Sequence, residues 1–246
     1  MNLCIDQGNS RTKVGLFSQN KLMEDFKYDQ FGKKELSDIL VEFPVKNCII
    51  SSVLSDNKEL IEDLNTKIQF SIELTHDTAL PIVNSYSTPE TLGNDRLAAV
   101  VGASFLKPES NILVIDAGTA ITYDFVNMKN QYQGGFITPG LNMRFRALNH
   151  FTDKLPLIKP QMPGNFYGKN TNDSIMGGVQ YGLEGEINRM IQYFNDFNGK
   201  LTIIITGGDS NYFEILLKSH KFVTKEIMLL GLNTILEFNY PFEIQE

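Results

Sequence analysis

Residues 6–13, Asp-Gln-Gly-Asn-Ser-Arg-Thr-Lys, lie between two short apolar runs, residues 1–5 and 14–17. This pattern predicts a strand, a tight turn and a second strand. A carboxylate at the end of the first strand, followed by a glycine and small polar side chains, is typical of a turn whose backbone N–H groups hold phosphate and whose carboxylate holds hydrated Mg²⁺. Ordinary hairpin turns use the same residues, because Gly, Asn and Asp tolerate unusual backbone angles. This stretch alone leaves both interpretations open.

A second stretch repeats this pattern in the middle of the chain. Residues 111–124, Asn-Ile-Leu-Val-Ile-Asp-Ala-Gly-Thr-Ala-Ile-Thr-Tyr-Asp, again place an apolar strand before Asp-x-Gly, with a Thr six positions after the Asp. The two stretches align Asp6 with Asp116, Gly8 with Gly118, and Thr12 with Thr122. A repeat at this spacing indicates two similar halves rather than a solenoid. Two halves with one phosphate-binding hairpin each suggest a nucleotide bound in the cleft between them.

The composition favours a globular protein that binds neither nucleic acid nor a membrane. The net charge of −7 argues against a broad nucleic-acid surface, although Arg144 and Arg146 are candidates for a local basic pocket. No apolar run approaches the length of a membrane span, and we expect no signal peptide and a cytoplasmic location. Cys4 and Cys48 lie in apolar stretches, which predicts two buried free thiols in a reducing compartment rather than a disulfide.

Strand and helix patterns alternate along the chain, which predicts two mixed α/β domains, residues 1–108 and 109–246. In the first domain, helical spacing occurs over residues 33–43, 56–68 and 96–106, with strands near 20–28, 47–53 and 69–74. In the second, strands are predicted over residues 112–115, 120–126, 133–138 and 202–205. Helices are predicted over residues 139–150 and 174–197, and two further helices close the chain.

The residues Gly93, Asn94, Asp95 and Arg96 lie between a long irregular segment and a predicted helix. A helix N-terminus favours anions, and an arginine there can hold a carboxylate through two parallel hydrogen bonds. The neighbouring aspartate could accept a proton from a hydroxyl group. The alternative is a plain helix cap, because Asn and Asp are common at that position.

The order of these motifs resembles that of type III pantothenate kinases, within the actin-like ATPase superfamily that also holds sugar kinases. The motifs are D-x-G-N-[ST]-x-x-K at residues 6–13, G-x-D-R at 93–96, D-x-G-T-A-x-T at 116–122 and G-G-x-I-x-P-G at 134–140. The resemblance implies an α/β fold of two ribonuclease H-like domains, with mixed sheets flanked by helices and an active cleft between them. It also implies ATP-dependent phosphorylation of pantothenate, the first step of coenzyme A biosynthesis.

The resemblance further implies roles for individual residues. Asp95 would be the general base, Arg96 would bind the substrate carboxylate, and Asp116 would hold a monovalent cation, K⁺ or NH₄⁺. ATP and Mg²⁺ would be held by Thr119 and by the first loop, with Asp6 near the metal: Asp6, Gln7, Gly8, Asn9, Ser10, Arg11, Thr12 and Lys13. The turn at residues 206–209 would lie on the adenosine side. Pantothenate would contact Tyr86, Gly93, Asn94, Asp95, Arg96 and, across a homodimer interface, Thr171.

Two other functions stay open from the residues alone. One is a non-catalytic regulator on the same scaffold, and the other is a kinase for a different carboxylate-bearing alcohol. The regulator is disfavoured by the presence of Asp6, Asp95, Arg96 and Asp116, and the acidic net charge argues against direct DNA binding. Arg96 beside Asp95 favours an alcohol that carries an acid group, but it does not identify which one.

Overall fold

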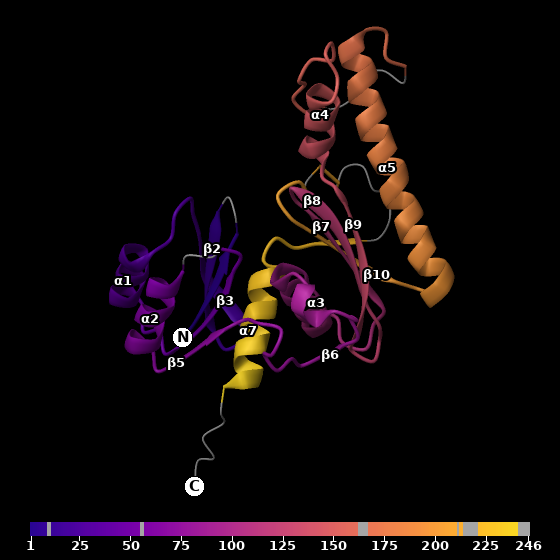
Figure 1. Cartoon of the computed structure of the whole chain (residues 1–246). Helices are drawn as coiled ribbons and strands as arrows, with labels where there is room; N and C mark the ends of the chain where they lie inside the picture. The colour runs from indigo at the N-terminus through magenta and orange to yellow at the C-terminus, as the bar shows by residue number, and fades with distance from the viewer. Residues whose placement is uncertain (9–10, 55–56, 162–166, 211, 214–220, 241–246) are drawn as a thin grey trace. The chain divides into compact units, whose positions relative to one another are not determined.

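The computed structural model describes residues 1–8, 11–54, 57–161, 167–210, 212–213 and 221–240 (Figure 1). The chain forms two compact units. Unit 1 comprises Met1–Glu109, Lys129–Gln133 and Glu226–Glu246, and unit 2 comprises Ser110–Met128 and Gly134–Lys225. The predicted boundary at residue 108 lies beside the division after Glu109, but the C-terminal segment is part of unit 1 rather than of the second half.

Unit 1 contains a mixed five-stranded sheet in the order β3-β2-β1-β4-β5. The first three strands are antiparallel, and β1, β4 and β5 are parallel. The strands are β1 (Asn2–Gln7), β2 (Thr12–Ser18), β3 (Lys21–Tyr28), β4 (Asn47–Ser52) and β5 (Phe70–Glu73). The helices α1 (Lys33–Glu42) and α2 (Lys58–Lys67) form the parallel connections, as their apolar spacing predicted.

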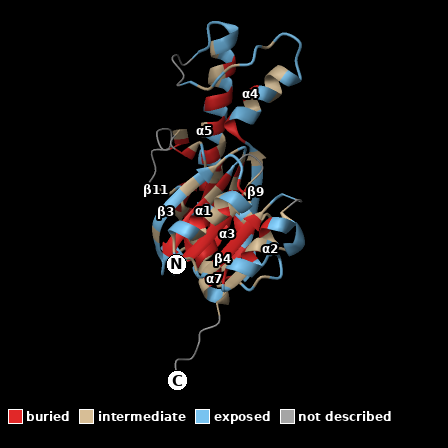
Figure 2. Cartoon of the chain, turned by 90° about the vertical axis from the view of Figure 1, so that its left-hand side faces the viewer, coloured by how far each residue is buried: buried red, intermediate tan, exposed pale blue. Residues whose placement is uncertain are grey.

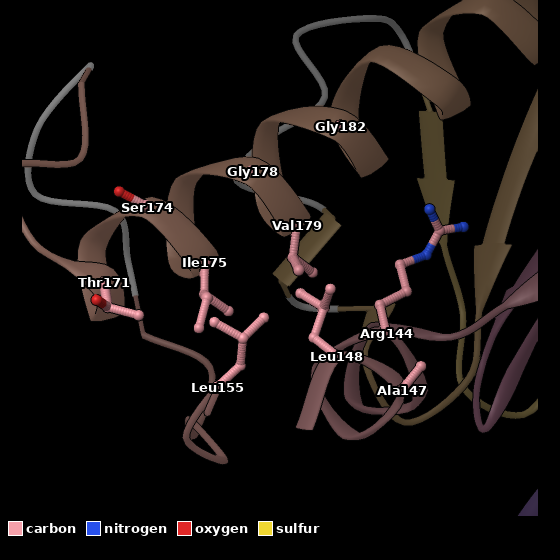
Figure 3. Close-up of a pocket in the computed structure, with 10 residues that line it drawn as sticks. All are labelled: Arg144, Ala147, Leu148, Leu155, Thr171, Ser174, Ile175, Gly178, Val179 and Gly182. Carbon is pink, nitrogen blue, oxygen red and sulfur yellow. The ribbon is translucent and has the colours of Figure 1, made fainter. Parts of the chain in front are cut away.

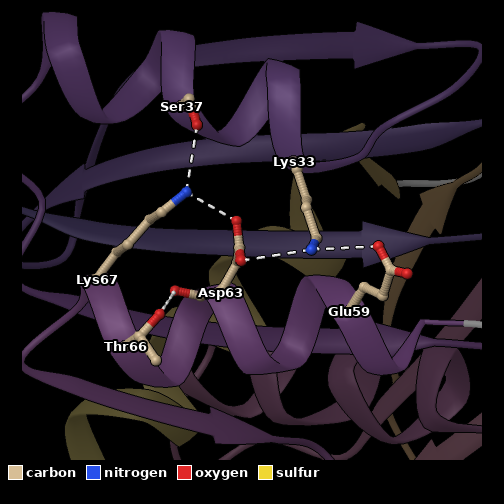
Figure 4. Close-up of polar contacts among 6 residues, drawn as sticks. All are labelled: Lys33, Ser37, Glu59, Asp63, Thr66 and Lys67. Atoms are coloured by element: carbon tan, nitrogen blue, oxygen red, sulfur yellow. Dashed lines mark hydrogen bonds and ion pairs between the residues drawn. The ribbon is translucent and has the colours of Figure 1, made fainter.

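Helices α1 and α2 cover one face of this sheet. Every second residue of the strands points to that face and packs against the helices in an apolar core. Leu3 and Ile5 from β1 pack there with Leu36 from α1 and Leu64 from α2. On the outer side of the two helices, Lys33 Nζ lies 3.2 Å from Glu59 Oε2, and Lys67 Nζ lies 2.7 Å from Asp63 Oδ2 (Figure 4). Surface pairs of this kind contribute little stability, so the apolar core holds the helices in place.

The opposite face of the sheet is covered by α7 (Ile227–Asn239), which packs against α3 (Asn94–Leu106). α3 is buried continuously from Arg96 to Ser104 and, with β4, is largely red in Figure 2. The two helices cross at Gly102 and Gly231, where a side-chain carbon on either glycine would collide with the backbone of the other helix. This backbone contact explains why α7 belongs to unit 1, a packing that no local sequence pattern could predict.

Cys4 and Cys48 are both buried and free, as predicted. In the β1–β4 register Cys4 pairs with Ile49, and Cys48 pairs with Leu3. Because side chains alternate along a strand, the two thiols point to opposite faces of the sheet. Burial raises the pKa of both thiols, so they remain protonated and unreactive.

The second sheet has six strands in the order β11-β10-β7-β8-β9-β6. They are β6 (Val83–Asn84), β7 (Ile112–Ala117), β8 (Ala120–Val126), β9 (Gln131–Pro139), β10 (Thr202–Thr206) and β11 (Lys221–Val223). The segment before α3 contains β6 and a short 3₁₀ helix, η1 (Pro89–Thr91), where the sequence indicated only irregular structure. β11 was not predicted, and the first of the two predicted closing helices falls mainly on residues outside the described ranges.

Unit 2 also contains α4 (Leu141–His150) and the long helix α5 (Thr171–Asn198). α5 begins three residues earlier than predicted because the Asn170 side chain accepts a hydrogen bond from the Asp173 N–H at 2.9 Å. Buried residues recur every three or four positions along it and belong to the core of unit 2, to which α4 and the sheet also contribute: Ile175, Val179, Leu183, Ile187, Ile191 and Phe194. Among the described residues, no helix is both long and apolar enough to cross a membrane.

The repeat between the two hairpins holds for the aspartates and glycines but not for the threonines. In the first hairpin Asp6 pairs with Lys13, whereas in the second Asp116 pairs with Thr122. The first turn is one residue longer, so Thr12 lies opposite Gln7. The predicted equivalence of Thr12 and Thr122 is therefore wrong, because equal spacing in the sequence does not give equal register when the turns differ in length.

Candidate active site

The first hairpin places a carboxylate and an ammonium group side by side. Asp6 and Lys13 are direct cross-strand partners, so their side chains leave the same face of the sheet with Cβ atoms about 5 Å apart. Both are half-buried. The turn between the strands is closed by the Gly8 N–H, which donates to the Arg11 carbonyl oxygen at 3.1 Å. The predicted contacts at Asn9 and Ser10 lie outside the described residues.

Two predicted ATP ligands in this loop have their side chains inside unit 1. Gln7 is buried, its Nε2 donates to the Phe31 carbonyl oxygen, and its Oε1 accepts from Ser52 Oγ at 2.8 Å. Thr12, its cross-strand partner, is also buried. The exposed Arg11 side chain lies 3.4 Å from Asp29. Of the described loop side chains, Asp6 and Lys13 are therefore the best placed to act on phosphate or metal.

The start of α3 holds the second group of predicted site residues. Gly93 is the N-cap, and a side-chain carbon there would collide with Asp95 Oδ1. Asn94 Nδ2 donates to the Leu74 carbonyl oxygen at 2.8 Å, which fixes the helix to the end of β5. Asp95 is exposed, and its Oδ1 accepts the Arg96 N–H at 2.8 Å. The carboxylate thus accepts a backbone N–H in the first turn of its own helix while remaining accessible to solvent.

Arg96 and Tyr86 come together, as the prediction of a shared substrate site requires. Arg96 is buried, and its guanidinium carbon lies 5.7 Å from the centre of the Tyr86 ring. This distance is within the range of a cation–π interaction. Tyr86 in turn stacks on Tyr132, with ring centres 6.1 Å apart and an angle of 13° between the rings. No pattern in the sequence indicated that Tyr132 belongs to this group.

In unit 2 three glycine-containing turns gather around Asp116. The Thr119 carbonyl oxygen accepts the Gly140 N–H at 3.1 Å, and the Ala117 carbonyl oxygen accepts the Asp209 N–H at 2.9 Å. Strand β10 ends beside Asp116, because Thr206 pairs with it in the parallel register. The motifs at residues 116–119, 139–140 and 206–209 are therefore one structural site. The Thr119 side chain is exposed there.

Position 207 requires glycine, both because of its backbone conformation and because of the atoms around it. Its φ of 93° lies in the left-handed region, and a side-chain carbon would collide with Asp116 Oδ1 and with the Ala117 carbonyl oxygen. Gly140 is similarly restricted, by the carbonyl oxygens of Gly118 and Thr119. Only glycine leaves room at these two positions for the backbone to approach the Asp116 hairpin.

Glu186 on α5 anchors the turn that reaches Gly140. It accepts two hydrogen bonds from Arg144 Nη2, at 2.7 and 2.9 Å, and one from Thr138 Oγ1 at 2.9 Å. Arg144 Nε also donates to the Pro139 carbonyl oxygen at 2.8 Å. Arg144 is thus neutralised by Glu186, which argues against its predicted use in a basic pocket. Sequence reasoning missed Glu186 because its partners lie 42 and 48 residues away.

Thr171, the first residue of α5, lines a cavity of about 780 Å³ between α4 and the first half of α5 (Figure 3). Its wall is mainly apolar, with Leu148, Leu155, Ile175 and Val179 in the middle. The Thr171 hydroxyl lies at one end and the Arg144 guanidinium group at the other. Thr171 is exposed, so a second molecule could reach it.

Among the described residues no three His, Cys, Asp or Glu side chains gather as a metal site. Mg²⁺ does not need such a cluster when phosphate oxygens and water complete its coordination, so the single carboxylate of Asp6 fits. Asp116 Oδ1 and the Ala117 carbonyl oxygen both lie against Gly207. Oxygen donors of this kind suit a hard cation, so Asp116 fits a monovalent-cation ligand.

Asp209 is expected to destabilise the fold at neutral pH. Burial raises the pKa of its carboxyl group above the ordinary value of 3.8, so the folded protein holds the proton more tightly than the unfolded chain. The ionised group therefore lowers the free energy of unfolding above the raised pKa, and this penalty is gone below about pH 3.8. We expect Asp209→Asn to raise Tm at pH 7, by an amount that shrinks as the pH falls through the raised pKa.

Thermal unfolding of both proteins between pH 4 and pH 8 measures this effect. Asp153→Asn, at an exposed position in the same unit, is the control and should change Tm little at any pH. A lower Tm for Asp209→Asn at pH 7 would show that the carboxylate stabilises the fold instead.

The two mixed sheets with their flanking helices define the fold class: that of actin-like ATPases and sugar kinases. A Listeria monocytogenes protein described as an N-acetylmannosamine kinase aligns with a TM-score of 0.60 and 12% identity, over 97% of this chain and 99% of that chain. A Campylobacter jejuni structure described under the Baf family of transcriptional activators aligns with a TM-score of 0.63 and 23% identity, over 96% and 98%. At these identities the likeness shows the fold alone.

The chain belongs to the type III pantothenate kinase family, whose model matches residues 2–193. A type III pantothenate kinase from Phocaeicola vulgatus is 42% identical over 240 residues, which covers 97% of this chain and 99% of the relative. One from Cytophaga hutchinsonii is 41% identical over 239 residues, with 97% and 100% covered. The resemblance seen in the motifs is thereby confirmed.

Proposed function

We propose that this chain transfers the γ-phosphoryl group of ATP to the primary hydroxyl group of pantothenate, giving 4′-phosphopantothenate and ADP. This is the first step of coenzyme A biosynthesis, and we assign it to the cytoplasm. Membership of the family supports the reaction. The observation that carries it is the start of α3, where the exposed Asp95 carboxylate precedes an arginine whose guanidinium group rests on Tyr86.

In this proposal Arg96 binds the pantothenate carboxylate and Tyr86 lies beside it. A guanidinium group presents its N–H donors in one plane, so two of them can meet the two carboxylate oxygens. Gly93 and Asn94 hold the backbone at the helix start, where the N-terminal N–H groups favour a negative charge. Lysine would not replace Arg96, since it offers a point charge without the planar face.

Two groups of residues are proposed for ATP. In unit 1, Lys13 would lie near phosphate and Asp6 would hold Mg²⁺, which when bound offsets the charge of the phosphate oxygens. In unit 2, Thr119 would contact ATP and the turn at residues 206–209 would lie on the adenosine side. Asp116 would hold K⁺ or NH₄⁺, which would add positive charge near the phosphates.

Asp95 acts as the base in the transfer step. It accepts a hydrogen bond from the primary hydroxyl group, which orients that oxygen towards the γ-phosphorus, and it takes the proton as the O–P bond forms and the bond to ADP breaks. Phosphoryl transfer passes through a loose transition state, so positioning matters more than the strength of the base. A carboxylate at the start of a helix is adequate for this role.

We also propose a homodimer in which Thr171 of the partner subunit completes the pantothenate site. The exposed position of Thr171 at the rim of an apolar cavity supports this assignment. Size-exclusion chromatography with light scattering should give twice the chain mass at assay concentrations. A monomer with full activity would contradict the shared site.

The test of the proposed function is ADP formation by the purified protein with Mg²⁺, with and without pantothenate, in K⁺ and in Na⁺ buffer. We expect turnover that depends on pantothenate and falls about tenfold or more in Na⁺. Equal turnover in both buffers would contradict the assignment of a K⁺ site to Asp116. No turnover in a folded sample would favour the regulator or a different carboxylate-bearing alcohol.

A further inference from the structure

Tyr132 lies outside every motif of the sequence and yet is held against the proposed substrate site. It belongs to β9 and is fully buried. Its backbone pairs with Asn84 of β6, and its carbonyl oxygen accepts the Ser85 N–H at 3.0 Å. The ring of the next residue, Tyr86, stacks on the Tyr132 ring, with an angle of 13° between them. Backbone and ring thus hold the segment at residues 83–86 to the same strand.

The Tyr86 side of this arrangement is also fixed. The Tyr86 N–H donates to Asn84 Oδ1 at 3.0 Å, a local turn that sets the direction of the Tyr86 side chain. Its ring lies 5.7 Å from the Arg96 guanidinium carbon. The Tyr86 ring therefore contacts both the buried Tyr132 ring and the Arg96 guanidinium group.

An aromatic ring is a suitable support for an arginine that must bind a carboxylate. The ring attracts the face of the guanidinium group. The N–H donors lie in the plane of the guanidinium group and point past the edge of the ring, so they stay available to a carboxylate. A free arginine side chain loses considerable rotamer freedom when it binds a ligand. An arginine already held on a fixed ring loses less of that freedom, so it binds the carboxylate more tightly.

We propose that Tyr132 is a positioning residue for carboxylate recognition, acting through Tyr86 on Arg96. This inference rests on the proposed function, because it concerns the carboxylate of pantothenate. Tyr132 touches neither substrate nor reacting atoms in this account. Its effect should therefore fall on the affinity for a carboxylate-bearing substrate and leave the phosphoryl-transfer step unchanged.

The experiment compares Tyr132→Leu and Tyr132→Phe with the wild type on two substrates, pantothenate and its neutral amide, which lacks the carboxylate charge. We expect Tyr132→Leu to raise KM for pantothenate about tenfold, with kcat and the KM for ATP changed by less than about twofold. The neutral amide should show almost no change in kcat/KM. Tyr132→Phe keeps the ring and should behave like the wild type.

The same protein sample is used for both substrates, so any loss of folded protein cancels in the comparison. A second test adds Tyr132→Leu to Tyr86→Leu, where it should have little further effect on KM for pantothenate. An equal loss on both substrates, or an unchanged KM for pantothenate, would overturn the inference without affecting the proposed function. Absence of wild-type turnover with pantothenate would overturn both.

Discussion

Replacing Asp95 with asparagine is expected to lower kcat by about 10²- to 10⁴-fold, while the Kd values for ATP and pantothenate stay within a few-fold of the wild type. The two side chains have the same shape. The asparagine Oδ1 can still accept the Arg96 N–H that Asp95 now accepts at 2.8 Å, so the start of α3 should keep its structure. The Nδ2 group that replaces the second oxygen cannot take a proton from the substrate hydroxyl group.

Steady-state kinetics, together with calorimetric titration of each ligand, separates the chemical step from binding. Asp38→Asn is the matched control, since it removes the same charge from an exposed helical position in unit 1. It should leave kcat unchanged. If Asp95→Asn keeps more than about a tenth of the wild-type kcat, another group must accept the proton.

Replacing Gly207 with alanine is expected to lower Tm by roughly 3–10 °C and to raise KM for ATP at least about tenfold. The backbone there has a φ of 93°, which costs an L-residue about 1–2 kcal/mol. The added methyl group would also collide with Asp116 Oδ1 and the Ala117 carbonyl oxygen. Relief of that collision must move either the Asp116 hairpin or the turn at residues 206–209.

Gly208→Ala provides the control one residue away. A side-chain carbon at Gly208 meets no protein atom within 4 Å, and its φ is not in the left-handed region. It should therefore leave Tm close to that of the wild type. Thermal unfolding and ATP titration of both variants test whether position 207 requires glycine. An equal fall in Tm for Gly207→Ala and Gly208→Ala would contradict that requirement.

The order of strands and helices could be predicted wherever the pattern of residues within a single element was sufficient. The hairpin at residues 6–13 and its repeat at 116–122 were visible because each combines an apolar run with Asp-x-Gly, and the structure has both hairpins. The burial of the Gln7 and Thr12 side chains was not indicated by the sequence. Alternation along β1 puts Gln7 on the face opposite to Asp6, where it contacts Phe31 rather than a ligand.

Features that depend on distant parts of the chain could not be predicted. Glu186 meets Thr138 and Arg144, and Tyr132 meets Tyr86, only because strands and helices bring them together. The residues of each pair are too far apart in the sequence for the periodicity of a helix or a strand to indicate the contact. The same reason applies to α7, whose contact with α3 depends on two glycines 129 residues apart, Gly102 and Gly231.

The place of α7 in unit 1 also sets the order in which the protein can be completed on the ribosome. Residues of unit 2 are all synthesised before Glu226, whereas unit 1 lacks the partner of α3 until the last helix emerges. Domains generally fold as units during synthesis, so unit 1 completes its packing only after all of unit 2 has been translated. The helix that carries Asp95 and Arg96 therefore gains its packing partner α7 later than any residue of unit 2 is synthesised.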